Sequence, residues 1–306
     1  MIRSCVTVLA TILLAGCSGA APNGEVNAGR ARTEVPEVAT AASSTLARLP
    51  AELPTADVVS PSSLLRVVNA TSDAPPLDFC LRARGALDAP FDVGPLLLTQ
   101  GLSGGLAYGE VSAYVAVLPG AYDARIVAGG ASDCATALDG IPDRSDVPSL
   151  EPDGYATLVA VGSLAKSFFG MDLYRDDRTV SQGNAKVRFV HATVAAPALD
   201  VGTKSGEEFA PLFGGVAFRT AAAGAGVDEN GFVETPPNDT PTFALRVAGK
   251  SFDVLSLSGP ALAADSITSM FSIGVAGMKG RLVPAVVACA DLDTSRAPLS
   301  TCTTAP

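Results

Sequence analysis

The chain has 306 residues, of which 48% are hydrophobic and 17% charged, and it contains 30 glycines, 22 prolines and no tryptophan. This length allows one large domain or two ordinary ones, and the apolar content excludes a chain that is disordered throughout. The formal net charge of −10 leaves no basic field for a phosphate backbone, so we expect no nucleic-acid partner.

The N-terminus reads as an export signal. A positive charge at Arg3 precedes an apolar run over residues 6–15, and the run ends in the sequence LAGC at residues 14–17. An apolar run of about ten residues is too short to cross a hydrocarbon core of ~30 Å as a helix. We therefore predict a signal peptide over residues 1–17.

The LAGC sequence resembles the lipobox of bacterial lipoproteins. That resemblance implies that the thiol of Cys17 receives a diacylglycerol and becomes the first residue after cleavage. Two or more acyl chains anchor a protein stably, at about 0.8 kcal/mol per buried methylene. By analogy with Gram-negative sorting, Ser18 implies the outer membrane. An ordinary cleaved signal peptide is the alternative.

Residues 18–62 are rich in Ala, Pro, Glu, Ser and Thr, and no apolar periodicity is sustained in them. Such a composition cannot bury enough apolar surface to offset chain entropy. We predict a disordered tether with a typical reach of about 35 to 40 Å.

Two diverged copies of one unit follow the tether. Residues 65–79 align without a gap on residues 187–201, "GGLAYGEV" from Gly104 matches "GGVAFRT" from Gly214, and "YDARIVAGGASD" from Tyr122 matches "FALRVAGKSFD" from Phe243. The three blocks keep their order, which indicates an internal repeat. We place the copies at residues 63–181 and 182–291, with a C-terminal tail over residues 292–306.

Each copy contains short, β-branched or aromatic segments bounded by Gly, Pro or Asp, such as "LLRVVNA" from Leu64 and "YATLVAVG" from Tyr155. Short strands with turns every ten residues or so are typical of an all-β protein. We predict two tandem immunoglobulin-like antiparallel β-sandwich domains. In the second copy, residues 219–241 depart from the repeat, and we expect a long exposed loop there.

The segments "RVVNATSDAPPLDF", "GLAYGEVSAYVAVLPGAYDARI" and "VRFVHATVAAPALDV" are similar to the bacterial domain of unknown function family 4397, often found in tandem in exported proteins. The resemblance covers roughly residues 63 to 290. It implies a β-sandwich and an envelope location, but no activity. Where the family pattern has a tyrosine and an L-P-A-G turn, the second copy has residues 219–241 instead.

Four cysteines lie in the exported part beyond Cys17: Cys80, Cys134, Cys289 and Cys302. An even number in an exported chain indicates two disulfides, for which three pairings are possible. In the second copy Gly202 replaces Cys80 and residue 255 replaces Cys134. This joint loss favours a Cys80–Cys134 bond and a Cys289–Cys302 bond. No Cys-x-x-Cys spacing supports a metal site.

The sequence offers only weak catalytic candidates. Residues 101–105 match the G-x-S-x-G pattern around Ser103, and the only histidine, His191, follows later in the chain. That nucleophile elbow needs a helix after the serine, whereas a glycine-rich turn and a strand follow Ser103. The S-x-x-K match at residues 163–166 ends a strand, so we interpret it as chance.

His191 aligns with Asn69 in the first copy, so a structural role is the expectation for this histidine. Arg66 aligns with Arg188, and Asp78 with Asp200, which suggests strand-end salt bridges or turn caps. Calcium remains open as a ligand of the acidic clusters, which are Asp139, Asp143 and Asp146; Asp176 and Asp177; and Asp291 and Asp293.

The sequence therefore predicts a non-catalytic cell-envelope lipoprotein without a cofactor, anchored by lipid in the outer membrane, whose tandem sandwiches serve binding, adhesion or structural display. An envelope protein or a polysaccharide is the expected partner. The alternative is a secreted hydrolase of a serine type, using Ser103 and His191, or of a carboxylate type.

Overall fold

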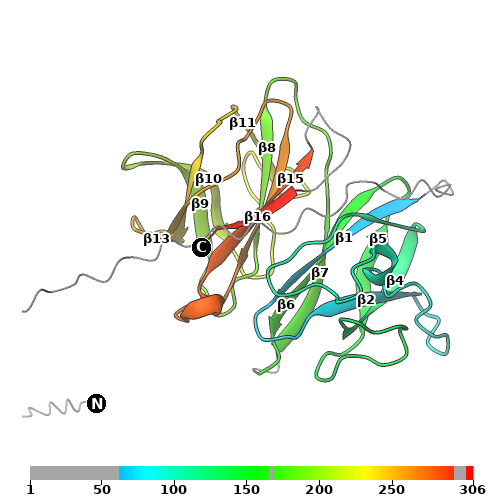
Figure 1. The fold of residues 1–306 in the computed structure, drawn as a ribbon. Helices are drawn as coiled ribbons and strands as arrows, with labels where there is room; N and C mark the ends of the chain where they lie inside the picture. Colours follow the sequence, from blue (N-terminus) through cyan, green and yellow to red (C-terminus); the bar gives the residue numbers. More distant parts are fainter. Residues whose placement is uncertain (1–61, 166–167, 293–300, 306) are drawn as a thin grey trace, which may run out of the picture. The chain divides into compact units, whose positions relative to one another are not determined.

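The computed structural model describes residues 62–165, 168–292 and 301–305 (Figure 1). Within these residues the regular structure is almost entirely strand, and the helices are two 3-10 turns, η1 (Leu98–Gln100) and η2 (Gly280–Leu282). No helix in the described part is long and apolar enough to cross a membrane. The predicted signal peptide, Cys17 and the tether up to residue 61 lie outside the described residues.

Seven strands form the first sandwich (Figure 1). One sheet has the order β3-β1-β6-β7 and the other β2-β4-β5. The strands are β1 (Ser63–Thr71), β2 (Leu77–Ala83), β3 (Val115–Val117), β4 (Gly120–Ala128), β5 (Arg144–Leu150), β6 (Tyr155–Ser163) and β7 (Phe168–Arg175).

Nine strands form the second sandwich, in sheets of order β11-β8-β14-β15-β16 and β10-β9-β12-β13. The strands are β8 (Ala185–His191), β9 (Leu199–Ser205), β10 (Glu208–Val216), β11 (Phe232–Thr235), β12 (Thr242–Val247), β13 (Asp253–Ser258), β14 (Ile267–Ile273), β15 (Ala285–Leu292) and β16 (Thr301–Ala305).

The two sandwiches share one strand order. The order β3-β1-β6-β7 corresponds to β11-β8-β14-β15, and β2-β4-β5 corresponds to β9-β12-β13, so β10 and β16 are additions to the second copy. The all-β fold is confirmed. The expectation of wholly antiparallel sheets is wrong for one pair in each copy, because β1 runs parallel to β6 and β8 runs parallel to β14. Each first strand is thus inserted beside a late strand of its own copy.

The expectation of a long exposed loop over residues 219–241 is also wrong in part. This segment contains β11, which pairs with β8 and places Phe232 opposite Arg188. Phe232 is 1% exposed. The strand is only four residues long and follows a glycine-rich stretch, so the periodicity of apolar residues did not reveal it.

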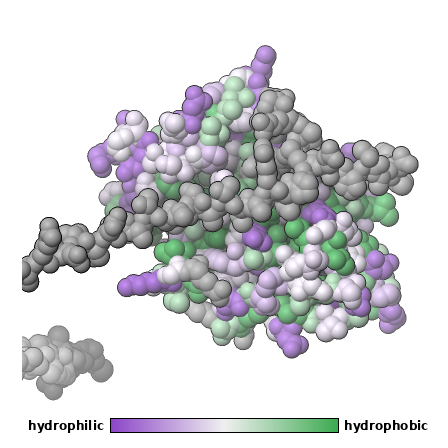
Figure 2. All heavy atoms as spheres, viewed as in Figure 1, coloured by the Kyte–Doolittle hydropathy of each residue, from purple (hydrophilic) through white to green (hydrophobic). Residues whose placement is uncertain are grey.

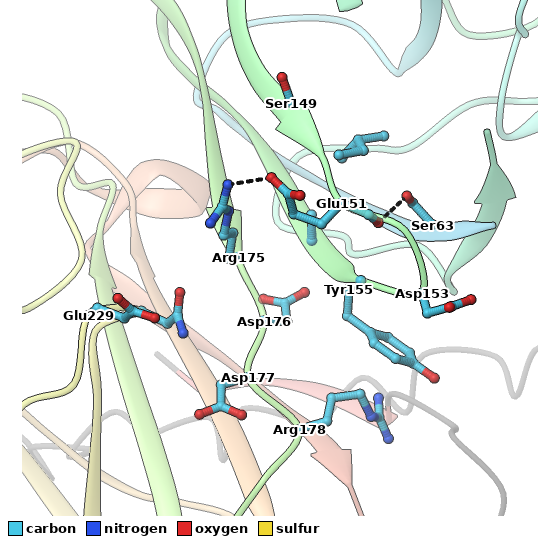
Figure 3. A pocket seen from close by; sticks show the side chains of 14 residues that line it. Ser63, Ser149, Glu151, Asp153, Tyr155, Arg175, Asp176, Asp177, Arg178 and Glu229 are labelled. Atoms are coloured by element: carbon cyan, nitrogen blue, oxygen red, sulfur yellow. Dashed lines mark hydrogen bonds and ion pairs between the residues drawn. The ribbon is translucent and has the colours of Figure 1, made fainter. Parts of the chain in front are cut away.

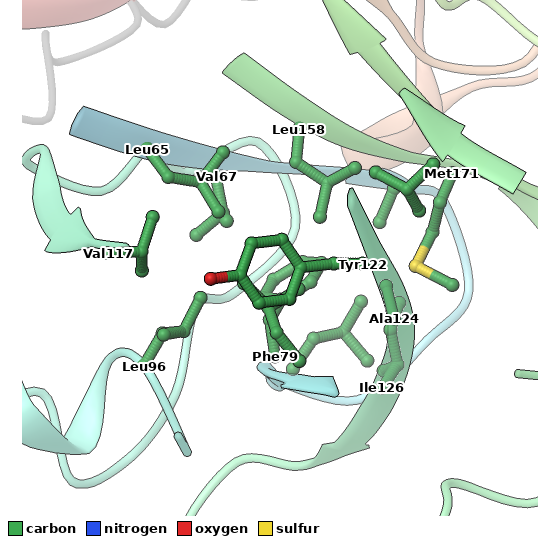
Figure 4. Close-up of a cluster of buried hydrophobic side chains, with 14 of the residues drawn as sticks. Leu65, Val67, Phe79, Leu96, Val117, Tyr122, Ala124, Ile126, Leu158 and Met171 are labelled. Atoms are coloured by element: carbon green, nitrogen blue, oxygen red, sulfur yellow. The ribbon is translucent and has the colours of Figure 1, made fainter. Parts of the chain in front are cut away.

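The core of the first sandwich follows the two-residue period of its strands (Figure 4). Phe79 in β2 and Tyr122, Ala124 and Ile126 in β4 point into the cluster, where they meet Leu158 of β6. Successive side chains of a strand point to opposite faces, so each strand contributes every second residue to this core.

Four central strands, β1, β6, β8 and β14, are buried along nearly their whole length. In β1, Leu65 and Val67 face the core of their own sandwich, whereas Val68 and Ala70 belong to a separate hydrophobic cluster. That cluster also contains residues of the second copy, among them Val190, Phe271 and Ile273. We call it the junction, because it buries the second face of these strands.

We expect Phe79→Ala to lower the free energy of unfolding by about 3 to 5 kcal/mol, because a fully buried ring leaves a cavity in a packed core. Urea unfolding of the purified protein measures this change. Leu87→Ala is the matched control, since Leu87 is 74% exposed and its truncation should change stability by less than about 0.5 kcal/mol. Equal effects of the two substitutions would contradict this account of the core.

Candidate functional site

Four charged side chains are buried together beside the junction: Arg66, Asp176, Arg188 and Asp291. We call them the charge cluster. The side chains of both arginines are 0% exposed, and those of Asp176 and Asp291 are 2% and 3% exposed. Buried charges are rare in proteins unless they are paired and hydrogen-bonded, so their pairing determines what this site does.

The arginines pair crosswise between the copies. Arg66 of β1 donates to Asp291 of β15, and Arg188 of β8 donates to Asp176, the residue after β7. Each copy therefore supplies one arginine and one aspartate, and each arginine finds its carboxylate in the other copy. The described residues that take part belong to one compact unit of the chain.

Each arginine also donates to a hydroxyl on the parallel strand next to it. The side chain of Arg66 donates to Thr157 Oγ1 at 3.1 Å from Nε and 3.0 Å from Nη2, and Arg188 Nη2 donates to Ser269 Oγ at 3.0 Å. The strand registers place Thr157 opposite Arg66 and Ser269 opposite Arg188. The parallel pairs therefore position equivalent hydroxyls in both copies.

An aromatic ring covers each guanidinium. The ring of Tyr114 lies 5.0 Å from the Arg66 guanidinium carbon, and the ring of Phe232 lies 4.6 Å from that of Arg188. Such cation–π contacts contribute up to about 2 kcal/mol when they are desolvated. Phe232 thus takes the place of the tyrosine that residues 219–241 lack, although it has no hydroxyl.

The hydroxyl groups donate further hydrogen bonds to the two carboxylates. Asp176 Oδ2 accepts from Tyr114 Oη at 2.8 Å and from Thr157 Oγ1 at 2.7 Å, and Asp291 accepts from Ser269 Oγ. Burial alone would raise the pKa of Asp176, but the attraction of Arg188 and Arg66 and these hydrogen bonds lower it overall. Burial alone would lower the pKa of Arg66, but attraction to Asp291 keeps it above its ordinary value.

These pKa shifts mean that Asp176 and Arg66 are charged at neutral pH. A carboxylate with a lowered pKa stabilises the fold fully above its unfolded-state pKa of about 3.9. That stabilisation is lost as the pH falls from there through the lower pKa of the folded state. Acid should therefore weaken the contact between the copies.

A turn of the second copy adds another contact. Arg219, with φ of 64°, pairs with Asp172 of β7, and Phe218 lies 5.6 Å from Phe168 between ring centroids. By the alignment of "GGLAYGEV" with "GGVAFRT", Arg219 corresponds to Gly109, which also has positive φ. A left-handed conformation is unfavourable for arginine by roughly 1 kcal/mol or more, and the Asp172 pair offsets it.

His191 ends β8 and is 0% exposed. Its Nε2 lies 3.0 Å from the Pro197 carbonyl oxygen, and its Nδ1 lies 3.3 Å from the Thr193 backbone nitrogen. Because the Thr193 amide can only donate, Nδ1 accepts and Nε2 carries the proton. Burial lowers the pKa of His191, so it is neutral in the fold.

Asn69, the counterpart of His191, makes one equivalent contact and one different contact. Its Oδ1 accepts from the Thr71 amide, two residues on, and its Nδ2 donates to the Leu106 carbonyl at 2.9 Å. Both side chains therefore hold the chain where it leaves the first strand of each copy. The structure assigns His191 the structural role that its alignment with Asn69 suggested.

The structure separates the other catalytic candidates. Ser103 lies in an exposed turn after η1 in the first copy, and no helix follows it before β3. Ser163 ends β6 and donates to Asp73, while Lys166 lies outside the described residues. Among the described residues, neither Ser103 nor Ser163 forms a hydrogen bond with His191.

Four residues of the predicted acidic clusters pair with cations of the protein itself, and Asp293 lies outside the described residues. Asp143 pairs with Arg125, Asp177 pairs with Lys186, and Asp176 and Asp291 belong to the charge cluster. No group of three or more His, Cys, Asp or Glu side chains suited to a metal ion occurs among the described residues. Asp78 and Asp200 each accept two or more backbone N–H groups of neighbouring loops, as turn caps do.

A hollow of about 410 Å³ opens beside the charge cluster (Figure 3). Glu151, Asp153 and Tyr155 line it from the β5–β6 turn and the start of β6, and Glu229 lines it from the second copy. Glu151 pairs with Arg175, as the dashed line in Figure 3 marks. The hollow is acidic and open, and it contains no pair of groups arranged as a nucleophile and a base.

The described residues contain two disulfides. Cys80 bonds to Cys134, and Cys289 bonds to Cys302, which lies directly opposite it across β15 and β16. At Gly202, the counterpart of Cys80, a Cβ atom would lie 2.3 Å from the Ala210 carbonyl oxygen. The backbone of Ala210 and the ring of Phe209, both from the added strand β10, thus leave no room for a cysteine side chain at Gly202.

The outer face of the smaller sheet carries a second recurring contact. Phe91 lies between Arg82 and Arg125, at 4.4 and 4.2 Å from their guanidinium carbons, and Phe209 lies 3.9 Å from that of Arg246. Each of these arginines also pairs with an aspartate. These faces are therefore charge-balanced, and they do not form a basic surface.

The sequence model of one protein family, described as a domain of unknown function (DUF4397), matches residues 63–202. This part of the chain is similar to that family. The match runs from β1 through the whole first sandwich and ends in β9 of the second, where β10 follows as an addition. No curated protein matches the chain. The DUF4397 match therefore gives a family resemblance for residues 63–202, and it assigns no reaction.

The DUF4397 segment contains Arg66, Asp176 and Arg188, but not Asp291. Sequence reasoning identified both arginines as an equivalent pair but missed their hydroxyl partners, Thr157 and Ser269. The signal that could have found them is the hydroxyl that each of two aligned strands carries at the same register position.

We expect Asp291→Asn to lower the free energy of unfolding by about 3 to 5 kcal/mol, because it leaves Arg66 charged, buried and without its carboxylate. Denaturant unfolding measures the loss, and the double variant Arg66→Met with Asp291→Leu should recover most of it.

The control is Glu151→Gln, which removes a pair whose side chains are 58% and 53% exposed and should cost at most about 1 kcal/mol. A change of similar size in Asp291→Asn would show that the charge cluster does not hold the copies together.

We expect His191→Asn to preserve the fold, since Asn69 accepts from the backbone amide two residues on as His191 does, and to reduce the dependence of stability on pH. A group whose folded pKa is lowered stabilises the fold fully above its unfolded value of about 6.5 and less as the pH falls below it. Unfolding midpoints at about pH 7.5 and about pH 5.5 should thus differ less in the variant than in the wild type. Because His191 is the only histidine, an unchanged difference would disprove its assignment as a buried neutral group.

Proposed function

We propose that this chain is a non-catalytic cell-envelope lipoprotein whose two sandwiches form one binding or display module. The observation that supports the proposal best is the crosswise charge cluster. Separating the copies would break the Arg66–Asp291 and Arg188–Asp176 pairs and leave only the longer contact of Arg66 with Asp176, at 3.9 Å, within the first copy. A stranded buried charge costs several kcal/mol, so the two copies act as one body.

The residues with catalytic potential are used in other ways, which supports a binding role over a hydrolase. His191 is 0% exposed and engages both ring nitrogens with the protein. Ser103, its partner in the alternative serine hydrolase, lies in a turn of the other copy. The DUF4397 family and the all-β fold are compatible with a binding or structural role.

The location is proposed from the sequence. The LAGC sequence at residues 14–17 supports lipid attachment at Cys17, and Ser18 supports the outer membrane. The membrane is then one partner, through acyl chains, and an envelope protein or a polysaccharide is the other. The net charge of −10 disfavours nucleic acid as a ligand.

We expect Cys17→Ala to lose incorporation of labelled palmitate and to move the protein from the membrane to the soluble fraction, because no acyl chain would hold it. Cell fractionation with palmitate labelling measures both changes, and Cys5→Ala is the control that keeps the anchor.

A Cys17→Ala protein that stays in the detergent phase and still takes up palmitate would exclude the lipoprotein. Ester hydrolysis by the purified wild type that disappears in Ser103→Ala would exclude the non-catalytic role. His191→Asn separates a loss of catalysis from a loss of fold in that assay.

A further inference from the structure

The edge strand β13 differs from the other sheet edges of the described part. It is the last strand of the order β10-β9-β12-β13 and pairs only with β12. Its sequence, DVLSLS, contains no proline, lysine or arginine. Unpaired edges of this kind present free N–H and C=O groups that can pair with another chain.

The neighbouring edges are protected in one of the ways that natural sheets use. In β5, the counterpart of β13, the sequence RSDVPSL includes a proline and charged residues, and β10 contains Pro211 and two register irregularities. The strands β3, β11 and β16 have three, four and five residues. Arg219 lies against β7 at Gly170 and Asp172. The pairing of β13 with β12 has one irregularity, between Leu245 and Arg246, but residues 255–258 of β13 pair regularly and contain no proline and no charge. This regular, uncharged stretch distinguishes β13 from the other described edges.

Exposed apolar side chains accompany this edge. Phe252, directly before the strand, is 60% exposed, and Val254, directly after Asp253, is 51% exposed. On the face of the protein shown in Figure 2, the side chains that project farthest are mostly hydrophilic, and hydrophobic residues lie among them. Large exposed apolar side chains beside an edge strand that contains no proline, lysine or arginine indicate an interaction surface.

We propose that β13 is an association site for a second copy of this chain, through antiparallel pairing of the two β13 strands across a two-fold axis. Such an axis is perpendicular to the sheet and keeps the faces of the two sheets aligned. Centred on Ser256, the pairing sets Val254 opposite Ser258 and Leu255 opposite Leu257 of the second copy. The two four-stranded sheets then become continuous.

Side-chain chemistry favours this self-pairing. Leu255 and Leu257 pack on the core side of their own sheet, so the pair extends the hydrophobic inner face across the axis. The outer face brings together only Val254, Ser256 and Ser258, which are uncharged.

The one charge of the strand does not oppose self-pairing. Asp253 lies beyond the paired residues and is already neutralised by Lys204 at 2.6 Å and Arg246 at 2.7 Å. Like charges thus never lie opposite each other, which is the usual obstacle to pairing of identical strands.

The test is cysteine crosslinking of the full chain, because Ser256 should lie next to Ser256 of the second copy at the axis. Ser256→Cys should give a disulfide-linked dimer on a non-reducing gel when an oxidant is added to intact cells or to the detergent-purified protein. The four cysteines of the described residues are already bonded and do not compete.

Ser149→Cys is the matched control, since Ser149 is an exposed serine of β5, the protected counterpart, and should give no dimer. Adding Val254→Lys to Ser256→Cys should abolish the crosslink, because a lysine on an edge strand opposes pairing. The unchanged unfolding midpoint of that double variant shows that it is folded.

Two results would overturn the proposal. One is a Ser256→Cys protein that forms no more dimer than Ser149→Cys. The other is a crosslinked product whose mass is not that of two copies, which would mean that a different chain uses this edge. Neither readout depends on lipid attachment, so the association can fail while the proposed anchoring holds, or the reverse.

Discussion

The crosswise pairs Arg66–Asp291 and Arg188–Asp176 place four charges out of water, and each has its counterion in the other copy. Such charges are tolerated only with complete pairing and hydrogen bonding. This requirement explains the surrounding polar residues: Thr157 and Ser269 give each arginine a hydroxyl partner, and Tyr114 donates to Asp176, although the buried Nε of Arg188 has no hydrogen-bond partner among the described residues. It also explains why β1 and β8 are inserted beside β6 and β14, since the parallel registers bring the hydroxyls to the arginines.

The sequence predicted the all-β fold, because alternation and turn residues are local properties. The crosswise cluster could not be predicted in this way. Alternation shows that Arg66 and Val68 share one face of β1, but it does not show that a second domain covers this face. A buried arginine and an exposed one look alike in a single sequence. The strand β11 could not be predicted for a related reason. Its role depends on the tertiary contact of Phe232 with Arg188, which the local sequence does not show.

Comparison of the two copies shows which functions of a residue survive divergence. Asn69 and His191 differ in chemistry, but each accepts a hydrogen bond from the backbone amide two residues on, so this contact is retained although the side chain is not. Their donor contacts differ, because Asn69 donates to the Leu106 carbonyl and His191 to the Pro197 carbonyl. Gly109 and Arg219 share a left-handed backbone, and only the second has gained a partner in the other copy. The two copies thus share one backbone arrangement and differ in the side chains that they place on it, and the only histidine of the chain is one of these differences.

Asp176 belongs both to the charge cluster and to the connection between the copies, which runs from the end of β7 at Arg175 to the start of β8 at Ala185. A connection this short sets the effective concentration of one sandwich at the other in about the millimolar range or above. Pairing within a chain therefore outcompetes exchange of sandwiches between chains at any ordinary protein concentration. Two molecules can then associate through other surfaces while each keeps its own two sandwiches paired. Such an assembly would consist of intact, complete monomers.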